Sequence, residues 1–193
     1  MNIAAFAGGV LSKAIRVPGP GGQPWRPGVD LFGFNIRPAA SGDFKRLAKL
    51  FEELDEFHRR GRPDLFVKAQ GPARGPDEIE ALMAGPDSTI LVAGDSAFPH
   101  LIGLVTVRIR ETPALPFQLA RRIAEIPNLG VARHARRHGL GRALMREASA
   151  FAALRGAAAV ELGVHEFNAG AIAFYEALGF RTVMRRLGVR LTE

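Results

Sequence analysis

The stretch Val131–Leu144, VARHARRHGLGRAL, follows an apolar run and precedes a run with helical periodicity. It contains four arginines, two histidines and the glycines Gly139 and Gly141. Glycine lets the backbone come close to a ligand, and the first N–H groups of a helix lie unpaired at the positive end of its dipole. The order of strand, glycine turn and helix therefore predicts a site for a phosphate group.

The composition indicates a single globular domain. The chain has 193 residues, of which 47% are hydrophobic and 23% charged, as in ordinary globular proteins. There is no cysteine, which excludes disulfides and thiolate metal sites. We find no apolar run of about 18 residues, and the positive charges near the start follow the apolar segment instead of preceding it. We therefore expect a soluble, cytoplasmic protein without a membrane partner.

The net charge narrows the partners to anionic ones. It is +7 at neutral pH, with an isoelectric point near 10.9. Such a charge favours nucleic acid, a membrane surface or a phosphorylated cofactor as the partner, and the charge alone does not choose among them.

Patterns along the chain predict a folded domain from 34 to 193 after a flexible N-terminal extension. Residues 1–33 are rich in glycine and proline and show no sustained periodicity. Strands are expected at 34–37, 89–93, 101–110, 123–131, 158–164 and 182–191, helices at 42–58, 76–83, 140–151 and 169–178, and a connector at 112–122. This order predicts an α/β fold with a mixed, mostly antiparallel central sheet flanked by helices.

Two motifs carry a resemblance to a known family. The segment Arg136–Gly141, RRHGLG, fits the signature R/Q-x-x-G-x-G/A of the GNAT superfamily of N-acetyltransferases, and it stands between a strand and a helix as that signature does. The segment Asn168–Phe180, NAGAIAFYEALGF, is similar to the second signature, N-x-x-A-x-x-x-Y-E-x-x-G-F. The resemblance covers about Phe34 to Leu191 and implies the acyl-CoA N-acyltransferase fold.

The resemblance implies acetyl-CoA as co-substrate and no metal. The pyrophosphate of acetyl-CoA would lie against the glycine turn, at Arg136, Arg137, His138, Gly139, Leu140, Gly141 and Arg142. Its pantetheine arm would pair with the strand edge at Leu129, Gly130 and Val131, where one N–H would stabilise the oxyanion of the tetrahedral intermediate. Asn168 would bind the pantetheine arm, cap its own helix, or do both.

The resemblance also implies how the reaction is catalysed. Tyr175, the only tyrosine, would protonate the leaving sulfur or hold it by a hydrogen bond. Many members of the family place a glutamate four residues before the position of Val131, where this chain has Pro127. The base that takes the proton of the amine is therefore left open among Glu125, Glu166, His58, a water relay and no base at all.

The expected function is transfer of the acetyl group of acetyl-CoA to a primary amine of a small molecule, amino acid or peptide by direct attack. One alternative, suggested by Pro127, is an acyl-CoA-binding module of the same fold without catalysis. A nucleic-acid-binding protein is a weaker alternative that rests on charge alone. Arginines in the loops 57–76 and 111–122 favour an acidic acceptor. Nothing in the sequence decides between a monomer and a homodimer.

Overall fold

A computed structural model describes residues 34–71, 73–95, 100–189 and 191. The expected flexible extension, residues 1–33, lies outside this part. The chain divides into two compact units. One unit runs from Val17 to His165 and contains all the strands and the first three α-helices of the described part, whereas the other includes Glu166–Glu193 and contains the last helix.

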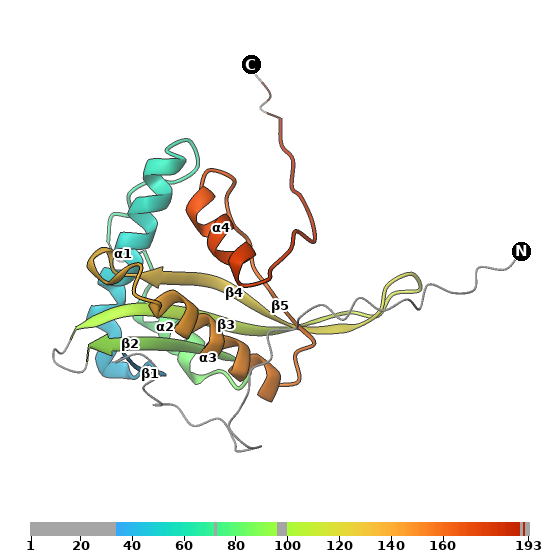
Figure 1. Ribbon diagram of the computed structural model, residues 1–193, viewed down its shortest axis with the longest axis horizontal. Coiled ribbons are helices and arrows are strands. Elements are labelled where there is room, and N and C mark those ends of the chain that lie inside the picture. Colours follow the sequence, from blue (N-terminus) through green and yellow to red (C-terminus); the bar gives the residue numbers. More distant parts are fainter. Residues whose placement is uncertain (1–33, 72, 96–99, 190, 192–193) are drawn as a thin grey trace, which may run out of the picture. The chain divides into compact units, whose positions relative to one another are not determined.

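The first unit is built on a mixed, mostly antiparallel sheet, as predicted (Figure 1). Its five strands lie in the order β1-β2-β3-β4-β5; they are β1 Phe34–Pro38, β2 Ser88–Asp95, β3 Leu101–Thr112, β4 Arg121–Val131 and β5 Ala159–Glu161. Neighbouring strands are antiparallel except for β4 and β5, which are parallel. A parallel neighbour requires a crossover connection, which the helix between β4 and β5 provides.

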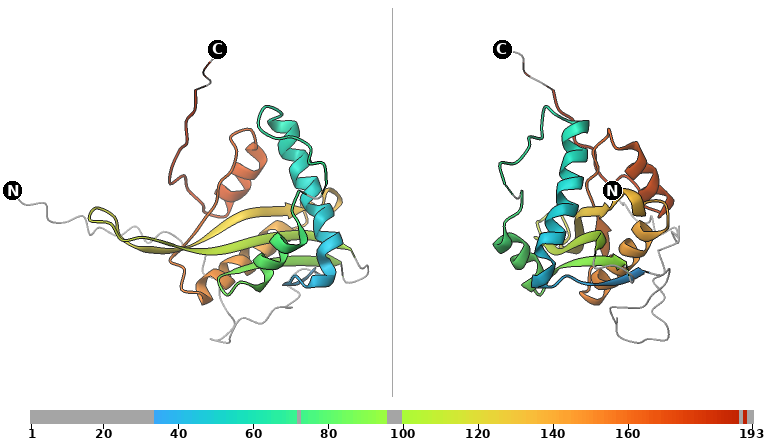
Figure 2. Two further views of the ribbon diagram at one scale, coloured as in Figure 1. Left: turned by 180° about the vertical axis from the view of Figure 1, so that it is seen from behind. Right: turned by 90° about the vertical axis from the view of Figure 1, so that its left-hand side faces the viewer.

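Helices cover both faces of the sheet. In Figure 2, α1 (Phe44–Gly61) and α2 (Pro76–Ala84) lie on one face and α3 (Leu140–Leu154) lies on the other. Each helix buries an apolar stripe, for example Leu47 and Phe51 of α1 and Leu144 of α3. None of the helices in the described residues has the length and apolar character needed to span a membrane.

Three expected boundaries were wrong. Strands β3 and β4 extend into the predicted connector and leave only 113–120 between them. The strand expected at 158–164 is reduced to β5. Residues 182–189 and 191 form no strand, although one was predicted at 182–191, and Val183, Leu187 and Leu191 are exposed. Alternation makes a strand only where a neighbouring strand pairs with it, and no described strand does so here.

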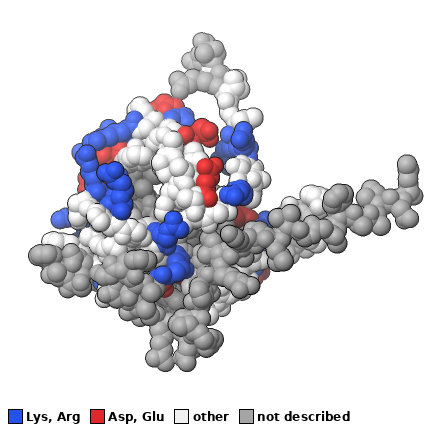
Figure 3. Space-filling view, in the orientation of Figure 1, with Lys and Arg blue, Asp and Glu red and all other residues white. Residues whose placement is uncertain are grey.

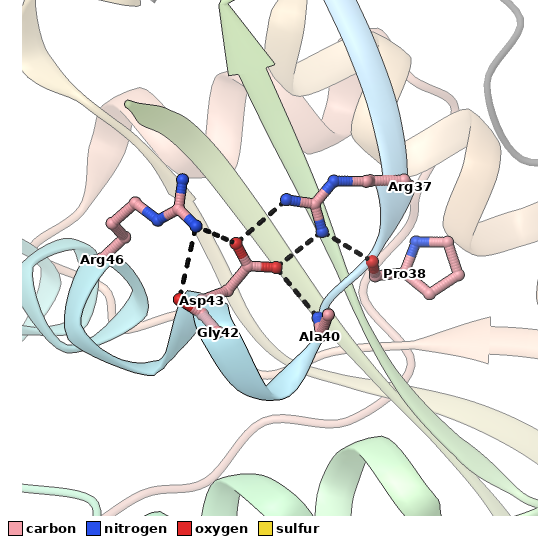
Figure 4. Close-up of polar contacts among 6 residues, drawn as sticks. All are labelled: Arg37, Pro38, Ala40, Gly42, Asp43 and Arg46. Carbon is pink, nitrogen blue, oxygen red and sulfur yellow. Dashed lines mark hydrogen bonds and ion pairs between the residues drawn. The ribbon is translucent and has the colours of Figure 1, made fainter. Parts of the chain in front are cut away.

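A buried carboxylate joins β1 to the start of α1 (Figure 4). Asp43 is 1% exposed and accepts hydrogen bonds from Arg37 at 2.6 and 2.9 Å and from the N–H of Ala40 at 2.9 Å. Arg46 lies 3.0 Å from the same carboxylate. The hydrogen bond from Arg37 is the main reason that the pKa of Asp43 is lowered.

We expect Asp43→Asn to lower the free energy of unfolding by about 2 kcal/mol at neutral pH, because hydrogen bonds to a charged group are worth roughly 1.5–3 kcal/mol. A carboxyl with a lowered folded-state pKa stabilises the fold above its ordinary pKa of about 4, and this contribution disappears as the pH falls through the folded-state value. The deficit of the variant should therefore shrink in acid. Urea unfolding of both proteins across the acid range measures this, and a deficit independent of pH would contradict it.

Candidate functional site

The turn between β4 and α3 has the backbone of an anion-binding cradle. A single 3-10 turn, Arg133–Ala135, follows β4. Arg137 and Gly139 then have positive φ angles of 66° and 85°. Left-handed residues that alternate with ordinary ones turn successive N–H groups toward one concave side, where an anion binds. Only glycine adopts the angle of Gly139 without strain, so the sequence fixes the turn at this residue.

The first turn of α3 adds further donors to the cradle. Gly139 is the N-cap, and the first regular helical bond runs from the N–H of Ala143 to the carbonyl of Gly139, at 3.0 Å. The N–H groups of Leu140, Gly141 and Arg142 precede it and point out of the helix start. Because α3 has 15 residues, its dipole adds a partial positive charge at the same place.

The close packing of α3 on the sheet fixes where the cradle stands. A Cβ atom on Gly103 of β3 would lie 2.9 Å from Leu144, 3.1 Å from Leu140 and 3.3 Å from the carbonyl oxygen of Gly130. The first two turns of α3 therefore lie directly on β3, beside the end of β4. This places the helix start next to the edge of β4.

We expect Gly103→Val to lower the free energy of unfolding by about 2 kcal/mol, because overpacking a well-packed core typically costs 1–3 kcal/mol. Gly130→Ala is the control for stability, since its added Cβ would make an ordinary contact of 3.8 Å with Leu104. Chemical denaturation of the two variants tests the packing, and equal stability of the two would contradict it.

Arginines supply charge at the cradle. Arg133, Arg137 and Arg142 are exposed, and within the described residues none of them makes an ion pair with a carboxylate. Arg136 donates from Nε to the carbonyl of Val131 at 2.9 Å. Figure 3 shows basic side chains gathered on the left, where Figure 1 places the turn between β4 and α3. These charges are therefore available to an anionic ligand.

The arginines of the two loops thought to face the acceptor are arranged differently. All six form ion pairs within the described chain: Arg59 and Arg60 with Glu56, Arg62 with Asp64, Arg74 with Asp55, Arg121 with Glu161, and Arg122 with Asp87 and Glu111. Their charges are already compensated, so the expected preference for an acidic acceptor loses its basis in these arginines.

An unpaired strand edge begins near the middle of β4. Pairing with β5 covers only Ile123 to Glu125, and no described strand pairs with 126–131 on that side. On the other side β4 remains paired with β3 as far as Val131, with a β-bulge in which Ile126 and Pro127 both lie opposite one residue. Proline cannot donate to a ladder, so a bulge is a site that tolerates it. The expected opening beside β4 is thus present in the structure.

The register decides which backbone groups face this edge. Ala132 donates its N–H to the carbonyl of Ile102 on β3, at 2.8 Å. The direction of hydrogen bonding alternates along an antiparallel strand, so Gly130 also faces β3. Leu129 and Val131 therefore direct their N–H groups off the open edge. The sequence had named all three residues without this distinction.

The candidates for a base lie in different surroundings. Glu125 is the last residue of β4 paired with β5, and its carboxylate accepts hydrogen bonds from Arg110 at 3.1 Å. His58 lies near the end of α1, and its Nδ1 is 2.9 Å from the carbonyl oxygen of Leu54. Since the carbonyl only accepts, Nδ1 carries the proton and the lone pair of the neutral ring is on Nε2.

Sequence reasoning missed the partner of His58. The ring of His165, four residues beyond β5, lies 5.7 Å from that of His58, and Phe66 lies 5.4 Å from both. This cluster ties the segment after β5 to the end of α1. No local signal could have indicated it, because the two histidines are far apart in the sequence. Among the described residues, no three His, Asp or Glu side chains form a group that could hold a metal ion.

The second unit carries the other motif on helix α4 (Ala169–Ala177). Asn168 caps this helix, because its side-chain oxygen accepts the N–H of Ala171 at 3.1 Å. Tyr175 packs edge-on against Phe174 and Phe180, with ring centroids at 5.2 and 5.6 Å. Burial raises the pKa of Tyr175 to about 12. The side chain is therefore a neutral phenol at any physiological pH.

The site combines an anion cradle at a helix start with an unpaired strand edge of a mixed sheet. This combination defines a class of α/β proteins suited to a nucleotide-bearing cofactor with a peptide-like arm. Comparisons with known proteins specify the class. A family model described as "Acetyltransferase (GNAT) family" matches residues 47–180. The chain therefore belongs to the GNAT family of acetyltransferases.

The individual relatives support this assignment. The mycothiol acetyltransferase of Corynebacterium kroppenstedtii is 43% identical over 68 residues, which cover 35% of this chain and only 19% of that protein. The solved structure of a tetramutant of the BH1408 protein from Bacillus halodurans has a TM-score of 0.76 and 29% identity, covering 81% of this chain and 99% of that one. An aminoglycoside N-acetyltransferase, AAC(6')-Iy, in complex with CoA, has a TM-score of 0.62 at 15% identity, covering 82% and 94% of the two chains, a likeness of fold alone.

Proposed function

We propose that this protein transfers the acetyl group of acetyl-CoA to a primary amine of a small molecule, amino acid or peptide. The observation that carries the proposal is the cradle beside the open edge of β4. A pyrophosphate suits the left-handed turn, the start of α3 and the unpaired arginines around them. The amides of a pantetheine arm suit the outward backbone groups of Leu129 and Val131. Residues 34–193 would form the catalytic domain.

The chemistry assigned to the residues is direct transfer. The amine nitrogen attacks the thioester carbonyl carbon, the carbon–sulfur bond breaks, and the amine loses a proton. An N–H of the β4 edge stabilises the negative charge on the carbonyl oxygen. Tyr175 hydrogen-bonds the departing thiolate, and Asn168 adds a contact to the pantetheine arm besides capping α4. Glu125 and His58 are the candidates within the first unit for accepting the proton of the amine, and Glu166 in the second unit is a third.

A coenzyme-release experiment tests this function. Thermal unfolding with acetyl-CoA measures binding, and a thiol-reactive dye measures free CoA in the presence of amino acids, peptides, polyamines and aminoglycosides. Release of CoA that depends on one of these amines, with the acetylated amine found by mass spectrometry, supports the proposal. Tight binding without release for any amine would indicate an acyl-CoA-binding module. Absence of binding would overturn both.

A further inference from the structure

The residue that follows the bulge of β4 is held by an unusual pair of hydrogen bonds. Asn128 donates both its backbone N–H and its side-chain Nδ2 to the hydroxyl oxygen of Thr106 on β3, at 3.0 and 3.1 Å. Thr106 is fully buried. A buried hydroxyl is costly unless it is hydrogen-bonded. Here one such hydroxyl accepts from both the main chain and the side chain of a single residue.

A second contact holds the other end of the same side chain. The Oδ1 atom of Asn128 lies 3.5 Å from Nη2 of Arg74. Arg74 is itself fixed by Asp55, at 2.7 and 3.1 Å, and its guanidinium lies 4.2 Å over the ring of Phe51. The amide thus has its donor toward Thr106 and its acceptor toward a cation, the orientation that matches both partners.

These contacts determine where the next N–H points. The peptide group between Asn128 and Leu129 rotates about the backbone torsions of these two residues. Anchoring Asn128 at its N–H and at its side chain fixes the residue from which that peptide starts and so restrains its N–H, which Leu129 directs off the open edge. Two N–H groups face the open edge, and that of Leu129 is farther from the cradle along the strand than that of Val131. The carbonyl of Val131 already accepts a hydrogen bond from Arg136. The thioester is the end of the coenzyme farther from its pyrophosphate.

We propose that Thr106, acting through Asn128, is a positioning residue that aims the N–H of Leu129 at the carbonyl oxygen of the acetyl thioester. The inference rests on the proposed function. A donor that stabilises an oxyanion acts only from the correct place, and a displacement of about 1 Å at a reacting centre can cost roughly 10²-fold in rate. The bulge precedes Asn128, which is paired with Thr106, and here the hydroxyl of Thr106 accepts the N–H that a main-chain carbonyl accepts in a regular ladder.

The test compares two substitutions that differ in one group. Thr106→Val keeps the shape and loses the hydroxyl, whereas Thr106→Ser keeps the hydroxyl and loses a methyl. Thr89→Val on β2, also a buried threonine, is the matched control. The readouts are kcat with the best amine of the panel and the ratio of the Kd values for CoA and acetyl-CoA, since only acetyl-CoA has the carbonyl that meets Leu129.

We expect Thr106→Val to lower kcat by about 10- to 100-fold and to weaken acetyl-CoA binding more than CoA binding, because the acetyl carbonyl loses its aimed donor. Thr106→Ser and Thr89→Val should keep the wild-type kcat and the wild-type ratio. If Thr106→Val fails to fold, Arg74→Ala, which removes the outer contact, should change kcat and the ratio in the same direction.

Equal changes in Thr106→Val and Thr106→Ser would overturn the inference, as would equal weakening of CoA and acetyl-CoA. Unchanged kcat and binding in Thr106→Val would overturn it as well. In each of these results the wild-type protein still binds acetyl-CoA, so the proposed function stands. Absence of acetyl-CoA binding by the wild-type protein would overturn the proposed function and this inference together.

Discussion

Gly141→Glu is expected to abolish the protection that acetyl-CoA gives against heat unfolding. Gly141 is the second residue of α3, and its N–H is among those that the proposed function assigns to the pyrophosphate. A glutamate would place a negative side chain where the backbone must approach an anion. At a coenzyme concentration of 100 times its Kd, wild-type protein gains about 2.7 kcal/mol, and the variant should gain almost nothing.

The same substitution should leave the ligand-free protein at least as stable. Glutamate has a better helix propensity than glycine by roughly 0.5–1 kcal/mol, and an acidic residue in the first turn interacts favourably with the dipole. Compared with the wild-type protein, the variant should therefore melt at the same or a higher temperature without acetyl-CoA, and its melting temperature should rise much less when acetyl-CoA is added. Gly71→Glu is the charge-matched control, because a Cβ there has no neighbour within 4 Å. Undiminished protection of Gly141→Glu would remove the cradle as the coenzyme site.

Tyr175→Phe is expected to keep acetyl-CoA binding and to slow turnover by roughly 10- to 100-fold, the effect of a lost hydrogen bond to a charged group. Burial raises the pKa of Tyr175 to about 12. A thiol has a pKa near 8.5, so complete transfer of the phenolic proton to the thiolate would be uphill by about 5 kcal/mol. The residue is thus suited to hydrogen-bond the thiolate and not to protonate it fully. Steady-state kinetics and calorimetric Kd values measure the two effects.

The only tyrosine of the chain makes its ionisation directly observable. Phenolate absorbance should appear with a midpoint near pH 12, and it should be absent from Tyr175→Phe. Because the pKa is raised, the neutral phenol stabilises the fold below the ordinary pKa of about 10, and this contribution is lost as the pH rises through the folded-state value. Turnover should therefore show no loss from Tyr175 ionisation at neutral pH. A midpoint near pH 10 would contradict the burial of the phenol.

Features set by neighbouring residues could be predicted from the sequence. The order of elements, the glycine turn before α3 and the cap at Asn168 follow from local patterns and hydrogen bonds only a few residues apart. The open edge of β4 at Leu129, Gly130 and Val131 was predicted from the family resemblance and not from a local signal. Family resemblance supplied what these local signals do not, namely the type of cofactor.

Features set by register or by distant contacts could not be predicted. Whether Leu129 or Gly130 faces the open edge depends on the pairing with β3, and a shift by one residue reverses it. The strand expected at 182–191 does not form, because none of the described strands pairs with this segment. The contact of Arg74 with Asp55 spans 19 residues, and that of Arg121 with Glu161 spans 40, so the sequence alone showed charges without their partners.

The division of the arginines into paired and unpaired sets has a kinetic consequence. The unpaired guanidinium groups at the cradle are exposed, so they act on an approaching anion through solvent and are screened beyond about 8 Å at physiological ionic strength. If acetyl-CoA binds at the cradle as proposed, these groups govern how often the coenzyme arrives, whereas the backbone N–H groups at the start of α3 govern how long it stays. Salt should slow capture while leaving escape nearly unchanged.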